Sequence, residues 1–153
     1  MGSDWKEDLA AFFEEYAIIE TSKKETLDDF DQFCEFIAEP AFENLSEALK
    51  HFGITSKSQR AKGKSVTFKI NFPGSRIDNF HYEICLPKNS IEPRLTLRIS
   101  GRKNKRSVME EKPLPFMDNL DPVSVLKLKK EDIIQDIILH YHDFVLESLT
   151  TSL

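Results

Sequence analysis

The spacing of apolar residues changes at Gly53, and this change constrains the fold more than any other feature of the chain. Before Gly53, apolar residues recur every three or four positions, the period of an amphipathic helix. After Gly53 they recur every second position, the period of a strand with one buried face. A second helical pattern runs from about Lys130 to Leu149. This order predicts an α+β fold, a two-layer sandwich in which helices cover one face of a sheet and water covers the other.

Two helices are expected before Gly53. The second would begin at Ser22, because Ser22 and Glu25 form the spacing of a capping box. Pro40 lies within its apolar stripe and disfavours helical geometry in the preceding residue, so the stripe belongs either to a kinked helix or to two abutting helices. We favour a break at Ala38–Glu39. The stripe of the first helix consists of Trp5, Leu9, Phe12, Phe13 and Tyr16.

Three alternating segments predict strands, at Val66–Phe72, Phe80–Leu86 and Leu95–Ser100. Short turn-forming connections join them, which suits hairpins and predicts an antiparallel meander. A fourth strand is expected around Ser107–Lys112, where Val108 is the only firm apolar residue. The sheet should therefore have three or four strands.

The 153 residues are expected to form a single domain, long enough to bury about 68–70% of the surface of the unfolded chain. Residues 1–53 would be helical, 54–112 the sheet, 113–128 a connection and 129–153 the C-terminal helix. We expect no signal peptide and no membrane association, since no apolar run approaches the roughly 20 residues that span a bilayer. Cys34 and Cys85 cannot build a disulfide framework, so a cytoplasmic protein with reduced thiols is expected.

The net charge of -5 conceals a strong segregation. Residues 1–53 carry -10, residues 54–106 carry +10 and residues 107–153 carry -5. A basic sheet with basic loops is a plausible phosphate-binding surface, although exposed strands are often basic and the acidic helices offer intramolecular partners. No aromatic residue occupies the polar strand positions, and the pI is about 5.4, which both count against nucleic acid. The candidate nucleic-acid or anion contacts are Arg60, Lys62, Arg94, Arg98, Arg102, Lys103, Lys105 and Arg106.

Ligand-type side chains share one face of the C-terminal helix, at spacings of three and four. Asp136, His140 and Asp143 are of the types that hold a metal. However, they belong to the only polar stripe of an otherwise apolar helix, which should face water, so no metal or other cofactor is expected. The full stripe is Asp132, Asp136, His140, Asp143 and Glu147.

Sequence signatures of catalysis are absent: the chain has no H-E-x-x-H, C-x-x-C or G-x-S-x-G motif and no glycine-rich phosphate loop. Cys34 lies on an apolar helical stripe and is expected in the core. Cys85 lies on the polar side of a strand with His81 and Glu83, without a recognisable activating neighbour. We therefore assign no catalytic residue.

Surplus apolar surface on the helices predicts association. Phe33, Phe36 and Phe42 fall off the main stripe of their helix, so they need either a second covering layer or a partner. The apolar face of the C-terminal helix is broad enough to contact more than one element. The preferred hypothesis is a non-enzymatic interaction or adaptor module, binding an unknown protein or a second copy as a homodimer. The alternatives are a nucleic-acid-binding module and an enzyme using His140 with Asp136 and Asp143, or Cys85 with His81.

Overall fold

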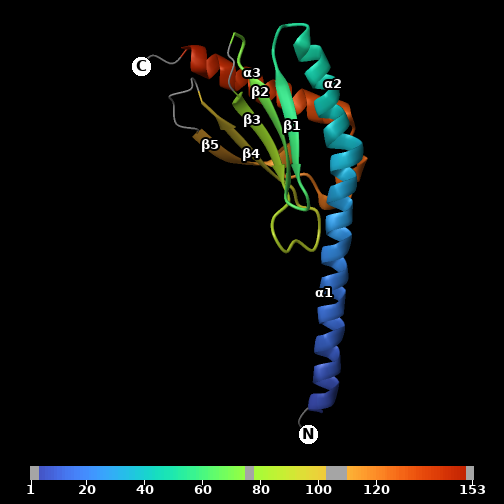
Figure 1. The fold of residues 1–153 in the computed structure, drawn as a ribbon. Helices are drawn as coiled ribbons and strands as arrows, with labels where there is room; N and C mark the ends of the chain where they lie inside the picture. Colours follow the sequence, from blue (N-terminus) through green and yellow to red (C-terminus); the bar gives the residue numbers. More distant parts are fainter. Residues whose placement is uncertain (1–3, 75–77, 103–109, 151–153) are drawn as a thin grey trace.

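The computed structural model describes residues 4–74, 78–102 and 110–150, and these form a long N-terminal helical stretch, a five-stranded sheet and a C-terminal helix (Figure 1). The α+β prediction is confirmed, with five strands in place of three or four. Among the described residues, no helix has the length and apolar character needed to cross a membrane.

The N-terminal stretch is helical throughout, in three parts: α1 (Trp5–Phe33), the π-helical turn η1 (Cys34–Ala38) and α2 (Glu39–Lys50). The predicted helix start at Ser22 is therefore wrong. The predicted break at Ala38–Glu39 is also wrong, because both residues keep right-handed helical dihedrals. Pro40 lies in the first turn of α2, where the wider π turn before it accommodates a residue that cannot donate an N–H.

The sheet is an antiparallel meander in the order β1-β2-β3-β4-β5. The three predicted strands correspond to β2 (Ser65–Asn71), β3 (Asp78–Cys85) and β4 (Thr96–Gly101). The fourth predicted strand is displaced toward the C-terminus, as β5 (Glu110–Pro115), and part of its expected range lies outside the described residues. The first strand, β1 (Ser56–Ala61), was not predicted, because its sequence SKSQRA has no apolar alternation.

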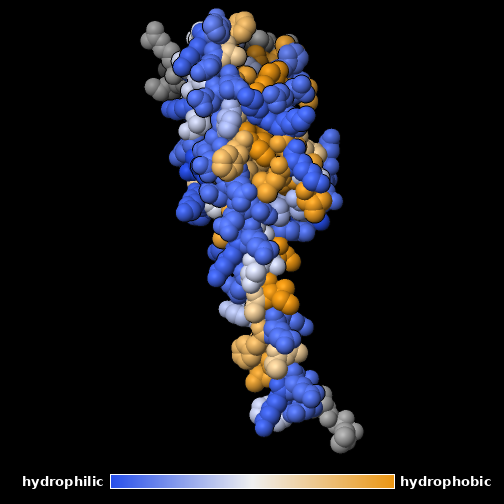
Figure 2. Space-filling model, turned by 90° about the vertical axis from the view of Figure 1, so that its right-hand side faces the viewer, coloured by the Kyte–Doolittle hydropathy of each residue, from blue (hydrophilic) through white to orange (hydrophobic). Residues whose placement is uncertain are grey.

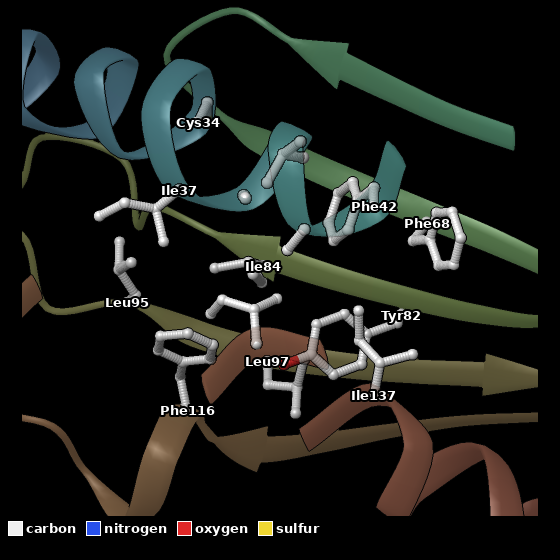
Figure 3. Packing of buried hydrophobic residues seen from close by; sticks show 14 of the residues in the cluster. Cys34, Ile37, Phe42, Phe68, Tyr82, Ile84, Leu95, Leu97, Phe116 and Ile137 are labelled. Carbon is white, nitrogen blue, oxygen red and sulfur yellow. The ribbon is translucent and has the colours of Figure 1, made fainter. Parts of the chain in front are cut away.

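The core lies between the helices and one face of the sheet, as the two-layer prediction requires (Figure 3). Phe68 on β2 lies opposite Tyr82 on β3, which in turn lies opposite Ile99 on β4. From the helical layer, Phe42 stacks on Phe68 with ring centroids 5.0 Å apart. Phe33 and Phe42 are both fully buried, so of the three off-stripe phenylalanines only Phe36 is left to solvent.

The segment expected as a connection holds two short 3-10 helices, η2 (Phe116–Asp118) and η3 (Pro122–Lys127). Phe116 is buried and meets Phe33 edge to face, at a centroid distance of 6.1 Å, so this segment closes one end of the core. The predicted C-terminal helix is confirmed as α3 (Lys130–Thr150), which buries Ile133 and Ile137 completely.

Candidate functional site

The first five turns of α1 project away from the rest of the molecule (Figure 1). Every residue from 4 to 19 is exposed, and the first fully buried residue of the helix is Thr26. We call residues 4–23 the arm and the remaining described residues the head. The arm is rich in apolar side chains, which are visible on its surface in Figure 2. They are Trp5, Leu9, Phe12, Phe13, Tyr16, Ile18 and Ile19, with exposed fractions between 43% and 67%.

One apolar seam runs along the whole of α1, because the helix is continuous through Ser22. Its positions alternate in steps of three and four residues, the heptad spacing of helices that pack against another helix. Within the head the seam is buried, at Thr26, Phe30, Phe33 and Ile37. Within the arm its residues are Trp5, Leu9, Phe12, Tyr16 and Ile19, all exposed, followed by Lys23, whose side chain is 32% exposed. We call these six residues the arm seam. The sequence contained this signal, but treating Ser22 as a helix start divided it.

A pocket of about 740 Å³ lies where the arm meets the head. Lys23 and Leu27 of α1 form one side, and the β1–β2 turn and the loop after β3 form the other. Leu27 is 47% exposed, and Asp28 and Asp31 also line the pocket, so it combines an apolar side chain with charges of both signs. Three further lysines line it, Lys62, Lys64 and Lys88. Of the members of the predicted anion-binding set that the structure describes, Lys62 alone lines this pocket.

The open face of the sheet carries a polar cluster centred on Glu83. Its Oε1 lies 3.1 Å from Nε of Arg98 and accepts from Sγ of Cys85 at 3.3 Å. Thr67 donates its hydroxyl to Oε2 of Glu83, also at 3.3 Å. Burial, followed by the hydrogen bond and charge of Glu83, raises the pKa of the Cys85 thiol to about 11. At neutral pH Cys85 is therefore a protonated thiol held by a carboxylate, which does not suit a nucleophile.

Most of the described basic residues of the predicted anion-binding surface already meet carboxylates of this chain. Arg60 on β1 forms ion pairs with Asp31 at 2.6 Å and Glu39 at 2.7 Å, which join the edge strand to the helical layer on either side of η1. Arg98 pairs with Glu83, and Arg94 pairs with Glu92. The backbone N–H of Arg102 donates to the carbonyl of Asn79. Three predicted contacts, Lys103, Lys105 and Arg106, lie outside the described residues. Anion binding remains a prediction.

The sequence predicted that the polar stripe of α3 faces water, but part of it faces the sheet. Tyr82 of β3 donates its hydroxyl to Oδ2 of Asp136 at 2.6 Å, and burial, with the charge of Asp136 beside it, raises the pKa of Tyr82 well above its usual value. His140 lies 3.6 Å from Asp136, whereas Asp143 lies beside His142. Within the described part of the chain, no three His, Cys, Asp or Glu side chains lie together as a metal site requires.

Comparison with known proteins gives no relative: the chain matches no family model, no curated protein and no solved structure. The features that bear on function are therefore the arm, the pocket beside it and the open face of the sheet.

Proposed function

We propose that this chain is a non-enzymatic macromolecular interaction module, whose arm is the docking element and whose head holds the arm in place. The observation that carries the proposal is the arm seam, in which five exposed apolar side chains and Lys23 continue a buried row. An exposed apolar surface of this extent is unusual on an isolated soluble domain and marks an interaction site.

The mode of binding follows from the form of the surface. Apolar residues at heptad spacing along a helix are recognised by a second helix or by an apolar groove. A helix of this kind gains most of its stability from packing of its apolar face, and the arm has no such packing within the described chain. A partner would therefore stabilise the arm as well as bind it.

The side chains of catalytic type have structural roles in the head. Asp136 accepts the hydrogen bond of a buried tyrosine, and Glu83 holds an arginine, a threonine and a cysteine. The burial of Cys34, with smaller contributions from nearby charges, raises the pKa of its thiol to about 12, so this cysteine is also protonated at neutral pH. Asp136 joins α3 to the sheet and Glu83 joins neighbouring strands, which is consistent with a binding module.

The proposal is tested by site-specific photo-cross-linking in an extract of cells that express the full chain. A photoreactive phenylalanine analogue replaces either Phe12, on the arm seam, or Glu14, on the opposite side of the same helix. We expect a discrete cross-linked protein from position 12 and at most a trace from position 14. Equal yields from both positions, or no product from position 12, would contradict the proposal.

Nucleic-acid binding is a second candidate, favoured by one feature of the sheet. Lys57 on β1 lies directly opposite Lys69 on β2, and Lys69 lies directly opposite His81 on β3. Neighbouring basic side chains on an open sheet face suit the phosphates of a nucleic-acid backbone. If it binds RNA or DNA, Lys69→Gln should lower the salt dependence of affinity by about one counterion. The absence of measurable binding at low salt would end this candidate.

A further inference from the structure

We propose that the partner of the arm is a second copy of this chain. The two arms would pair antiparallel, with their midpoints level with residue 14 of each helix. The inference rests on the proposed function of the arm as a docking element and adds to it the identity and direction of the partner.

The arm seam is self-complementary in one direction. If one arm is reversed against another about Glu14, Phe12 meets Tyr16 of the second copy, and Leu9 meets Ile19 of the second copy. Trp5 then meets Lys23 of the second copy, where the aromatic face suits a cation. Each pair joins the two different seam positions of the heptad, which is how antiparallel helices interdigitate.

The residues beside the seam fit the same register. On one side, Phe13 lies beside Phe13 of the second copy, and Lys6 lies beside Glu20 of the second copy. On the other side, Glu15 lies beside its own counterpart, a like-charge contact at an exposed position that costs little in water. The antiparallel register therefore places Phe13 against its own counterpart and makes Lys6 and Glu20 neighbours, with one like-charge contact at Glu15.

Charge also selects the direction. Between residues 4 and 20 the arm carries six acidic side chains and one lysine. A parallel pair would place the acidic first turns, with Asp4, Glu7 and Asp8, side by side. In the antiparallel pair each acidic turn reaches Lys23 of the other copy, where the pocket presents three more lysines against two aspartates, Asp28 and Asp31. Opposite charges at the ends steer association and fix the register.

The length of the exposed seam fits this arrangement. The paired segment runs from Trp5 to Lys23, and the first fully buried residue of α1, Thr26, follows three residues later. Each arm would therefore end where the other head begins, with the two heads at opposite ends of the pair. The overlap of 19 residues is about 28 Å long at 1.5 Å per residue.

The available area approaches that of a stable dimer. Four aromatic side chains of the arm are between 56% and 67% exposed. At about 150–250 Å² for each aromatic, they present about 350–600 Å² per copy. Leu9 and Ile19 add to this, so the area approaches the roughly 800 Å² per partner of a standard interface. A lipid surface fits less well, because helices that lie on membranes are rich in Lys and Arg on their polar face.

The test begins with the mass of the full chain in solution, measured by light scattering after size exclusion over a range of concentrations. We expect a dimer, with twice the monomer mass of 17.7 kDa. The double variant Leu9→Glu with Tyr16→Glu should raise the dissociation constant at least 100-fold, because it places charges inside the interface. The matched control, Ala10→Glu with Ala17→Glu, adds the same charge one position further along the same exposed helix and should change it less than about threefold.

Direction is tested by disulfide trapping in a Cys85→Ser background. Single variants Leu9→Cys and Ile19→Cys should remain uncross-linked alone and should form a disulfide-linked pair when mixed. A parallel pair would give the opposite result, since each cysteine would then face its own counterpart. Cross-linking of either variant with itself would overturn the antiparallel arrangement.

The outcomes separate this inference from the proposed function. A chain that stays monomeric at all concentrations, but cross-links to a different protein from position 12, overturns self-association and leaves the docking role intact. A monomer that instead binds phospholipid vesicles through the arm also overturns it. A dimer that survives Leu9→Glu with Tyr16→Glu overturns the arm as its interface, as does equal weakening by the control pair.

Discussion

The two halves of the long N-terminal helix carry the same apolar seam but differ in what covers it. From Thr26 to Ile37 the seam packs against the sheet and the C-terminal segment, and Phe33 is completely buried. From Trp5 to Ile19 the same spacing faces solvent. Heptad spacing thus predicts a helix whose apolar face packs against another surface. Whether that surface belongs to the same chain depends on where the helix lies relative to the sheet.

The largest difference between the halves should be in stability. Phe33→Ala leaves a cavity between Phe30 and Phe116 and should lower the free energy of unfolding by about 3–5 kcal/mol. Phe12→Ala removes the same ring from the arm and should change the stability of the head by less than about 0.5 kcal/mol. Urea unfolding of the two variants is followed by circular dichroism, because the single tryptophan, Trp5, lies in the arm and does not report on the head. A loss above about 2 kcal/mol in the arm variant, at a concentration where the chain is monomeric, would contradict the division into arm and head.

Alkaline pH should weaken the head through its buried thiol. The pKa of Cys34 is about 12 in the folded protein and 9 in an ordinary thiol, so the unfolded state loses its proton first as the pH rises. The contribution of Cys34 to the free energy of unfolding is therefore fully present below about pH 9 and is lost above it. Between pH 9 and 11 the loss should be about 2–3 kcal/mol. Urea unfolding of wild type and Cys34→Ala across this range should show a shallower decline in the variant. If the free energy of unfolding fell equally steeply with pH in both proteins, Cys34 would not be a source of the alkaline loss of stability.

The contact between Tyr82 and Asp136 holds α3 to the sheet and has no counterpart in the arm. Tyr82→Phe keeps the ring and removes the hydroxyl that donates to Asp136 at 2.6 Å, leaving a half-buried carboxylate with one bond fewer. We expect a loss of about 1–3 kcal/mol in the free energy of unfolding, measured by urea. Tyr16→Phe in the arm is the matched control and should leave the head unchanged. Equal effects would show that the hydroxyl contact contributes nothing specific.

Periodicity in the sequence predicted most of the fold, because a buried face imposes its spacing on the residues that form it. It missed β1, whose side chains are polar on both sides. It left open whether Phe33 and Phe42 are covered within the chain, and the structure buries both, Phe33 against Phe116 and Phe42 against Phe68.

The candidate site was predictable only in part. The stripe from Trp5 to Tyr16 is evident in the sequence, but its exposure depends on where the sheet ends in space. The inward direction of Asp136 depends on Tyr82, which lies 54 residues earlier in the chain. Contacts between residues so distant in sequence carry no local signal, and for the same reason the carboxylate partners of Arg60 were not identified.

The smallest loss in the free energy of unfolding is expected at the ion pairs of Arg60, which join β1 to the buried part of the N-terminal helical stretch. Arg60 bonds to Asp31 and Glu39, on either side of the π turn, and its side chain is 27% exposed. Arg60→Gln should cost about 1 kcal/mol, because the pair with Glu39 is bidentate and both pairs are partly shielded but still reached by solvent. Arg94→Gln, which breaks an exposed pair with Glu92, should cost less than about 0.5 kcal/mol. Hydrogen exchange provides the decisive measurement: protection should fall in β1 and near η1 in the Arg60 variant, while the arm keeps its wild-type rates. If exchange in the arm also accelerated, the arm and the head would be one cooperative unit, and the contrast between the two halves of the helix would be lost.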